Sequence, residues 1–261
     1  MATLSYEVLG TGEPLFILHG LFGSRRNWMS LAKPLSEFAR VIDVDLRNHG
    51  DSEHAATMSF PEMAEDVAQL ANRLGLEQVN IIGHSMGGKV AMVFALKYPA
   101  RTRRLMVLDV APVQYDSDFE RYIDAMRSVP LDRIRTRKEA EDHLASTVSD
   151  MTLRQFLLHN LVREGDRFRW RLNLQGIRGE LDRIAGFPPL AAGTSYAGPS
   201  VFLAGDRSEY LQPAHEPVIR HYFPAAELSV VENAGHWLHA DQPVAVLDGV
   251  RTLLLNPPYQ P

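Results

Sequence analysis

A serine stands at the centre of the sequence Gly-His-Ser-Met-Gly at residues 83–87, directly after the apolar run at residues 79–82. This G-x-S-x-G pattern is typical of a nucleophile elbow, a sharp strand-to-helix turn that presents a serine hydroxyl. Glycine at 83 and 87 removes the Cβ atoms that would clash in so tight a turn. The pattern therefore predicts Ser85 as a catalytic nucleophile, with the Met86 amide directed at the carbonyl oxygen of a bound acyl group.

A serine nucleophile works with a base, an orienting acid and amides that stabilise the oxyanion. We predict His236 as the base, because it follows the last expected strand and stands late in the chain, as the order serine, acid, histidine requires. In a parallel sheet that loop lies at the carboxyl edge, as Ser85 does. The His-Gly-Leu-Phe-Gly turn at residues 19–23 follows the first core strand, and we assign the Leu21 amide as the second oxyanion donor beside that of Met86.

Two other kinds of site share some of these residues. Residues 83–89 also fit G-x-x-x-x-G-K, the loop that cradles phosphate, but Val90 stands where Ser or Thr must ligate Mg²⁺. His236 and His239 are three residues apart, yet neither an H-E-x-x-H motif nor a surrounding set of carboxylates accompanies them. We therefore expect neither a nucleotide site nor a metal site.

The composition sets broad limits on function. With 261 residues, 45% of them apolar, the chain can bury a substantial core as one domain with an insertion. A formal net charge of −5 gives no electrostatic reason to bind nucleic acid or an anionic membrane. The sequence has no cysteine, which excludes disulfides and thiolate catalysis. Because no apolar run approaches the ~18 residues of a membrane helix and no export signal is visible, we expect a cytoplasmic location.

Short apolar runs alternate with longer helical patterns, which predicts a mostly parallel central sheet with helices on both faces. Strands are expected at residues 15–18, 41–45, 79–82, 105–110, 200–204 and 227–231, and helices at 61–74, 89–97 and 244–255. The alternation breaks after residue 111, where a long helical pattern begins. We therefore predict a core made of residues 1–111 and 190–261, and a helical lid inserted at residues 112–189.

The predicted lid is rich in arginine and in large apolar side chains. We expect the arginines to form a solvated surface rather than an anion site. The large apolar side chains include Tyr115, Phe119, Tyr122, Met126, Phe156 and Trp170. We expect most of these six to form the core of the lid, because a small helical insert must bury apolar surface of its own.

Five motifs occur in order along the chain. They are His-Gly-Leu-Phe-Gly-Ser at 19–24, Asp-x-Arg-Asn-His-Gly-x-Ser at 45–52, Gly-His-Ser-Met-Gly-Gly-Lys at 83–89, Asp-Val-Ala-Pro at 109–112 and Gly-His-Trp-x-His-Ala at 235–240. Together they resemble the α/β-hydrolase superfamily and, within it, small bacterial esterases of the YbfF type. The resemblance covers about residues 12–255 and is weakest in the lid. It implies an α/β-hydrolase fold and the hydrolysis of esters or thioesters without a cofactor.

The resemblance also bears on the orienting acid. Many members place it in a G-x-x-D turn after the strand that follows the lid, but here Ser208 stands at that position and Asp206 directly follows Gly205. We therefore predict Asp109, at the end of the preceding strand, as the acid, as in the family that this chain resembles. Ser208 is then expected to hydrogen-bond the Asp109–His236 pair as a fourth catalytic residue.

Selectivity for a substrate must come from the walls around the reacting carbonyl. Phe22 and Trp237 flank the predicted catalytic groups in the sequence, and Tyr115 and Phe119 of the lid are further candidates for substrate binding. These walls predict a small-molecule ester with a short-to-medium acyl chain, cleaved through an acyl-enzyme on Ser85. An acyl-CoA thioesterase, a carbon–carbon bond hydrolase with the same triad and a non-catalytic binding protein are the alternatives.

Overall fold

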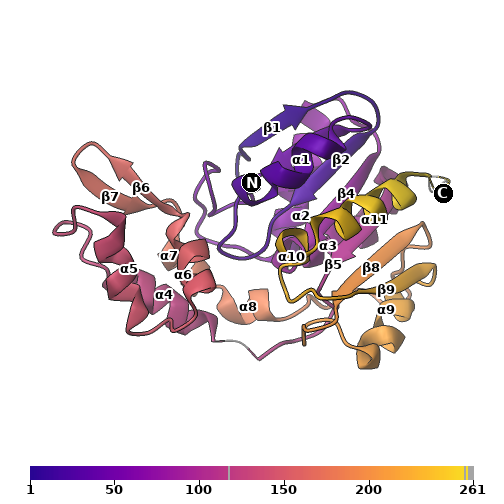
Figure 1. Ribbon diagram of the computed structural model, residues 1–261. Coiled ribbons are helices and arrows are strands. Elements are labelled where there is room, and N and C mark those ends of the chain that lie inside the picture. Colours follow the sequence, from indigo (N-terminus) through magenta and orange to yellow (C-terminus); the bar gives the residue numbers. More distant parts are fainter. Residues whose placement is uncertain (117, 256, 258–261) are drawn as a thin grey trace.

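A seven-stranded sheet forms the centre of the molecule, in the order β1-β3-β2-β4-β5-β8-β9. The computed structural model describes residues 1–116, 118–255 and 257 (Figure 1). The strands are β1 (Tyr6–Leu9), β2 (Pro14–Leu18), β3 (Arg40–Val44), β4 (Val79–His84), β5 (Thr102–Leu108), β8 (Ser200–Gly205) and β9 (Ala226–Val231). Neighbouring strands are parallel except for β1 and β3, which pair antiparallel at one edge. The predicted, mostly parallel sheet is thus confirmed.

The central strands are buried on both faces, as parallel strands between two layers of helices must be. Side chains of β2 alternate between the layers: Leu15 and Ile17 join one hydrophobic cluster, and Phe16 and Leu18 join the other. The strand β1 has no counterpart among the predicted strands. It is a short edge strand whose residues are exposed or half-buried, so it lacks the apolar run by which the others are found.

Helices cover both faces of the sheet (Figure 1). The helices of the core are α1 (Met29–Leu35), α2 (Phe60–Arg73), α3 (Met86–Lys97), α9 (Glu216–Tyr222), α10 (Leu238–Asp241) and α11 (Pro243–Leu255). Buried residues of α2 and α3 belong to one hydrophobic cluster, and those of α1 and α11 belong to the other. Three short 3-10 helices, Arg25–Trp28, Pro99–Arg101 and Pro213–His215, complete the core.

The segment between β5 and β8, called the inserted segment below, stands beside the sheet and returns to it after α8 (Figure 1). It contains α4 (Phe119–Ser128), α5 (Arg137–Ala145), α6 (Met151–Leu158), β6 (Leu161–Glu164), β7 (Arg167–Trp170), α7 (Leu174–Arg178) and α8 (Leu181–Ala185). The predicted boundaries, 112–189 for the lid and 1–111 with 190–261 for the core, stay predictions. Residues 256 and 258–261 of that core range lie outside the described residues.

The inserted segment is not purely helical as predicted, because β6 and β7 form an antiparallel hairpin. In β7, exposed arginines alternate with the buried side chains of Phe168 and Trp170, which is the period of a strand with one buried face. Gly165 supplies the positive φ, 60°, that the turn between the strands uses. The alternation spans only four residues, too few to stand out in a long helical pattern.

Lys89 of α3 joins the two ends of the inserted segment. Its buried ammonium donates to the carbonyl oxygen of Val113 (2.8 Å) at the outgoing end, and to those of Ala185 (2.8 Å) and Gly186 at the returning end. The centroid of the Tyr115 ring lies 4.6 Å from the ammonium nitrogen. Burial lowers the pKa of Lys89 to about 7. We call this arrangement the Lys89 clasp. In a phosphate-binding loop the lysine at this position would contact the nucleotide, but here its ammonium is bound by three backbone carbonyl groups.

Candidate active site

Five loops that follow strands meet at the carboxyl edge of the sheet, where ligands of open α/β sheets bind. They are residues 19–23 after β2, Ser85 after β4, Asp109 after β5, residues 206–208 after β8 and residues 232–237 after β9. These loops carry the predicted catalytic residues and Leu21, and Met86 directly follows Ser85 as the first residue of α3.

Ser85 occupies the turn between β4 and α3 with φ 51° and ψ −119°, a conformation that residues with a side chain rarely adopt. A Cβ on Gly83 would lie 2.1 Å from the carbonyl oxygen of Gly87, and one on Gly87 would lie 2.3 Å from that of Leu18. The Ser85 amide donates to the carbonyl oxygen of Leu108 on β5 (3.0 Å), which ties the turn to the sheet. The turn therefore has the geometry of a nucleophile elbow.

His236 lies next to Asp109, as predicted. Its Nδ1 is 2.7 Å from Oδ2 of Asp109, whose side chain is fully buried. The Ser208 hydroxyl donates to the same Oδ2, and the amide of Gly205 donates to Oδ1 (3.1 Å). Because a carboxylate accepts the hydrogen on Nδ1, the histidine presents Nε2 as its basic atom. His236 and Ser85 line the same pocket.

Asp206, the rejected candidate for the acid, has a different environment. Its Oδ1 accepts a hydrogen bond from the amide of Ala234 (3.0 Å), and its side chain is 36% exposed. Its pKa is lowered, first by hydrogen bonding to the backbone of Asn233. Asp206 thus braces the loop that carries His236 and does not contact the imidazole of that histidine through any hydrogen bond found among the described residues.

Two further side chains hold His236, and neither was predicted to do so. The ring of Tyr210 stacks on the imidazole, with centroids 3.9 Å apart and planes inclined by 22°. His84 donates from Nε2 to the carbonyl oxygen of His236 (2.7 Å). Burial, followed by the neighbouring His236 and His239, lowers the pKa of His84 well below its ordinary value, which keeps it neutral. No local signal marks either contact, because the partners are distant in the chain.

The two predicted oxyanion donors lie beside Ser85, since Leu21, Ser85 and Met86 line one small cavity. Met86 is the first residue of α3, so its amide is among those with no acceptor inside the helix. Two buried histidines hold the Leu21 loop: His19 accepts from the amide of Leu46 (2.9 Å), and His49 accepts from that of Phe22 (3.2 Å).

Both of these histidines are neutral in the folded protein. Burial lowers the pKa of His19 to about 4 and that of His49 to about 3. In each ring Nε2 is the acceptor, so Nδ1 carries the hydrogen and donates to a backbone carbonyl, that of Gly20 (2.8 Å) or Arg47 (2.9 Å). The motif at residues 45–52 thus supports the oxyanion loop from behind.

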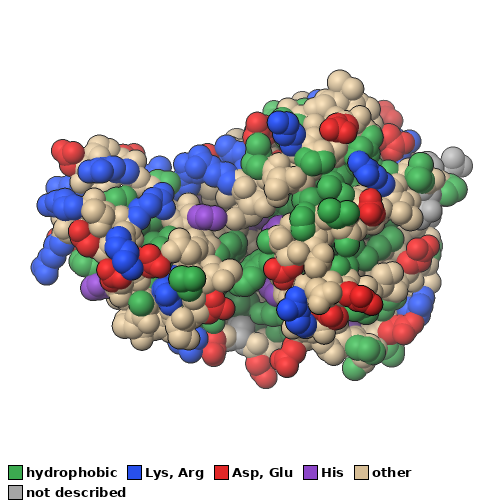
Figure 2. Space-filling model, in the orientation of Figure 1, with side chains coloured by type: hydrophobic (Ala, Val, Ile, Leu, Met, Phe, Trp, Pro, Cys, Tyr) green, Lys and Arg blue, Asp and Glu red, His purple; other side chains and the backbone are tan. Residues whose placement is uncertain are grey.

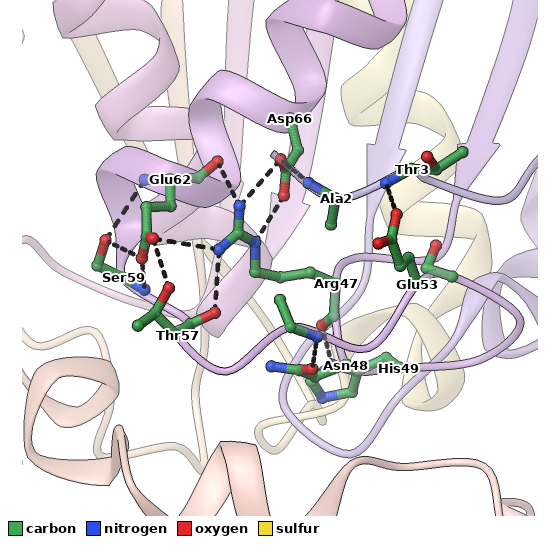
Figure 3. A network of polar contacts seen from close by, with 12 residues as sticks. Ala2, Thr3, Arg47, Asn48, His49, Glu53, Thr57, Ser59, Glu62 and Asp66 are labelled. Carbon is green, nitrogen blue, oxygen red and sulfur yellow. Dashed lines mark hydrogen bonds and ion pairs between the residues drawn. The ribbon is translucent and has the colours of Figure 1, made fainter.

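Arg47 anchors that motif to α2 (Figure 3). Its Nε and Nη2 contact the two carboxylate oxygens of Asp66 (2.6 and 2.9 Å). Its Nη1 donates to the carbonyl oxygen of Thr57 (2.9 Å) and lies 3.4 Å from the carboxylate of Glu62. The buried guanidinium is therefore fully paired within the protein rather than directed at a ligand.

The main pocket has a volume of about 210 Å³ and lies where the inserted segment meets the core. Its walls are the residues 19–23, Asn27, Trp28, His84, Ser85, Phe119, Tyr122, Leu153, Phe156, Tyr210, His236, Trp237 and His239. Hydrophobic and histidine side chains gather in this region of the surface (Figure 2). Three of the four predicted substrate-binding residues, Phe22, Phe119 and Trp237, line it, and the fourth, Tyr115, lines the small cavity beside it.

The expectation that most large apolar side chains of the lid form its core is wrong. Tyr115, Phe119, Tyr122 and Phe156 line the two cavities. Only Met126 and Trp170 of the six are buried within the segment, where the Trp170 indole donates to the carbonyl oxygen of Met126 (2.9 Å). The hairpin and α5 supply other core residues, which leaves these aromatic rings to face the site.

The histidines of the site are not arranged around a metal. Among the described residues, no group of three or more His, Asp or Glu side chains is placed to hold an ion. His239 stacks on Trp28 with centroids 4.6 Å apart. Likewise, none of the helices formed by the described residues has the length and hydrophobicity needed to span a bilayer.

A serine at a strand-to-helix elbow, with a His–Asp pair at the same edge of a parallel sheet, defines the class of α/β hydrolases. The family model for the alpha/beta hydrolase fold matches residues 13–243, and the chain belongs to this family. The chain is 43% identical to the sn-1-specific diacylglycerol lipase ABHD11 of Mus musculus, over 96% of this chain and 85% of that protein. It is 32% identical to the esterase YbfF of Escherichia coli, over 93% of both. A solved structure of a marine microorganism esterase matches with a TM-score of 0.94 and 38% identity, over 97% of this chain and 100% of that one.

Proposed function

We propose that the protein is a serine hydrolase that cleaves carboxylic esters through an acyl-enzyme on Ser85. The observation that carries the proposal is the hydrogen bond between His236 and the buried Asp109, beside a pocket that Ser85 also lines. The names of the relatives, an esterase and a diacylglycerol lipase, support an ester as the bond that is cleaved.

In the first half of the reaction, His236 acts as general base. Its Nδ1–H is held by Asp109, so its Nε2 takes the proton as Oγ of Ser85 attacks the acyl carbonyl carbon. Asp109 stabilises the imidazolium that forms. The carbonyl oxygen becomes an oxyanion, which the amides of Leu21 and Met86 stabilise by hydrogen bonds that strengthen in the transition state.

In the second half, the bond to the leaving group breaks and His236 gives its proton to the departing alcohol. Water, deprotonated by His236, then attacks the acyl-enzyme through the same oxyanion site. The carboxylic acid leaves and Ser85 regains its proton. Side chains, backbone amides and water supply all of this chemistry, so the proposed reaction needs no cofactor.

The proposed substrate is a small-molecule ester with a short-to-medium apolar acyl chain. Phe22, Phe119, Tyr115 and Trp237 offer apolar surface on either side of Ser85. Each methylene group that such walls accommodate contributes up to ~0.8 kcal/mol, so reactivity should rise with the length of an apolar group until the cavity that holds this group is full.

A thioester of a phosphate-bearing acyl carrier is the second candidate, because arginine side chains are frequent in the inserted segment and Arg26 stands next to a pocket residue in the chain. The pKa of Arg171 is lowered chiefly by burial; the charge of Asp51, whose carboxylate lies 3.5 Å from the guanidinium, raises it, and the charges of Arg26 and Arg169 lower it. Arg26 directly precedes the pocket residues Asn27 and Trp28. Lys and Arg side chains also gather on the inserted segment (Figure 2). Measurements at different salt concentrations distinguish the candidates. If arginines bind the phosphate groups, the rate advantage of a coenzyme A thioester over a matched simple ester should disappear at high ionic strength, because salt screens exposed charges. Binding of an apolar acyl chain should not change in this way.

The proposal predicts that Ser85→Ala abolishes ester hydrolysis. Loss of the nucleophile should lower kcat by at least about 10³-fold, leaving only the contribution of the oxyanion site and binding. Hydrolysis of a chromogenic acetate ester measures this, with Ser229→Ala, an exposed serine on β9, as the control. An organophosphonate should label Ser85 alone in a peptide map. Undiminished hydrolysis by Ser85→Ala, or a label on another residue, would refute the assignment.

A further inference from the structure

Two cavities meet at Ser85. The larger, of about 210 Å³, is the main pocket and contains His236 and Trp237. The smaller, of about 20 Å³, is lined by Met86, Lys89, Val110, Tyr115, Ile184 and Ala185 together with the residues that both cavities share. The shared residues are Leu21, Ser85, Phe119 and Tyr210. A carbon bonded to Oγ of Ser85 can therefore send its two substituents into different cavities.

Proton transfer assigns the larger cavity to the leaving group. When the acyl-enzyme forms, the proton taken from Ser85 passes from His236 to the oxygen of the departing alcohol. A general acid must lie within hydrogen-bond reach of that oxygen, about 2.6–3.2 Å. His236 lines the larger cavity and is not among the described residues that line the smaller one. This arrangement favours the larger cavity for the alcohol, so that the acyl substituent points to the smaller one.

The smaller cavity limits the size of that substituent. By the same measure of volume, about 10–15 Å³ is enough for one water-sized group, so the 20 Å³ admits at most one or two carbon atoms next to the oxyanion that the Leu21 and Met86 amides stabilise. Ile184 and Ala185 form part of its wall, and Ala185 is held by the Lys89 clasp. The base of the inserted segment therefore sets the depth of this cavity.

The buried lysine in this wall does not favour an anionic acyl group. An ammonium has three hydrogen-bond donors, and three carbonyl oxygens, of Val113, Ala185 and Gly186, accept them. Most of the other walls are apolar side chains, among them Val110 and Ile184. The cavity thus suits a short hydrocarbon group.

We propose that the smaller cavity is the acyl site and that the enzyme is selective for acetyl and propionyl esters of larger apolar alcohols. This assignment rests on the proposed serine hydrolase function and narrows its acyl range, short to medium, to the short end. Each methylene group beyond the capacity of the cavity should lower kcat/KM by roughly 10–200-fold. Extension of the alcohol should have a much smaller effect, because its cavity holds about 210 Å³.

Two series of esters test the proposal on the purified full chain. One series varies the acyl chain from two to eight carbons on a fixed alcohol, and the other varies the alcohol on a fixed acetyl group. Each series is measured with the wild type, with Ile184→Ala and with Phe156→Ala, because Ile184 lines the smaller cavity and Phe156 lines the larger one. Ile184→Val is a milder variant in case the alanine variant folds poorly.

We expect Ile184→Ala to move the acyl optimum toward chains longer by one to three carbons, with Ile184→Val intermediate and the alcohol series unchanged. Phe156→Ala should alter the alcohol series and keep the acyl optimum. If the wild type cleaves octanoyl esters as fast as acetyl esters, or if Phe156→Ala and not Ile184→Ala moves the acyl optimum, the assignment of the cavities is overturned. A failure of the proposed function itself would appear separately, as ester hydrolysis that survives in Ser85→Ala.

Discussion

Two of the predicted catalytic residues have a positive backbone φ, which is unusual for residues with a side chain. Ser85 and Asp109 have φ values of 51° and 52°, although neither is glycine. The amide of each donates a hydrogen bond to the next strand of the sheet. Ser85 donates to the carbonyl oxygen of Leu108 (3.0 Å), and Asp109 donates to that of Leu203 (2.8 Å). Conformations of this kind cost on the order of 1–3 kcal/mol and persist where the surrounding structure imposes them. Here the sheet imposes them, and it thereby directs both side chains to the same edge.

The acid should be identified by comparing Asp109→Asn, Asp206→Asn and Ser208→Ala. An asparagine at 109 keeps the shape but removes the charge that stabilises the His236 imidazolium, so kcat should fall by about 10³–10⁴-fold. Asp206→Asn should change kcat only slightly, because Asp206 bonds the amide of Ala234. Ser208→Ala removes one donor to Asp109 and should lower kcat by about tenfold.

These three variants should be measured by steady-state hydrolysis of one acetate ester, with circular dichroism to confirm the fold. A larger loss in Asp206→Asn than in Asp109→Asn would contradict the assignment of the acid. An unchanged rate in Ser208→Ala would remove Ser208 from the catalytic set while leaving Asp109 in place.

At the scale of elements, the inserted segment is attached to the core by one side chain that contacts both of its ends. The Lys89 clasp brings together carbonyl groups that are more than 70 residues apart in sequence, those of Val113 and of Ala185 with Gly186. The amide of Tyr115 adds a direct link, since it donates to the carbonyl oxygen of Ala185 (3.0 Å). The clasp therefore couples α3, which begins at the elbow, to the segment that forms the far wall of the pocket.

Lys89→Met should loosen this attachment. Methionine keeps the apolar stem but removes the donor from the carbonyl groups of Val113 and Gly186, whereas the carbonyl of Ala185 keeps the Tyr115 amide. The free energy of unfolding should therefore fall by about 1–3 kcal/mol. The Tyr115 amide should exchange its hydrogen faster, which hydrogen–deuterium exchange measures. Lys97→Met is the matched control, because Lys97 lies on the same helix, is 43% exposed and pairs with Glu65 at the surface. Equal protection of Tyr115 in the wild type and in Lys89→Met would show that the clasp has no mechanical role.

At the scale of the whole molecule, buried neutral histidines link stability to pH. Burial lowers the pKa of His19 to about 4, of His49 to about 3 and of His239 to about 4, and that of His84 well below its ordinary value. In the unfolded chain, histidine has a pKa of about 6.5. Between these values the unfolded state binds more protons than the folded state, so stability rises with pH there.

We expect the free energy of unfolding to fall as pH decreases from about 6.5 toward 4. Each buried histidine contributes a slope of up to about 1.4 kcal/mol per pH unit in that range. Urea denaturation at pH 7.5, 6.0 and 5.0 measures the slope. His49→Asn should lower this slope by up to about 1.4 kcal/mol per pH unit, because one buried histidine is removed. His221→Asn, at an exposed position, should leave the slope unchanged. A stability that does not change between pH 7.5 and 5.0 would contradict the buried, neutral state of these histidines.

The sequence by itself determined the elements whose causes are local. The elbow is visible because the contacts that exclude a Cβ at positions 83 and 87 leave glycine as the residue that fits there. The strands of the central sheet are visible as apolar runs because parallel strands are buried on both faces. The order of these strands along the chain then placed Asp109 and His236 at the edge that holds Ser85, and their contact at 2.7 Å agrees with that placement.

Only the tertiary structure decided which distant groups meet. The stacking of Tyr210 on His236, the bond from His84 to the His236 carbonyl and the Lys89 clasp join residues from separate elements, so no spacing in the sequence marks them. The strand β1 and the β6–β7 hairpin were missed because short, half-exposed strands are stabilised by their neighbours rather than by an apolar run of their own. The division of the site into a large and a small cavity likewise depends on where the inserted segment returns to the core, which is a property of packing and not of any local pattern.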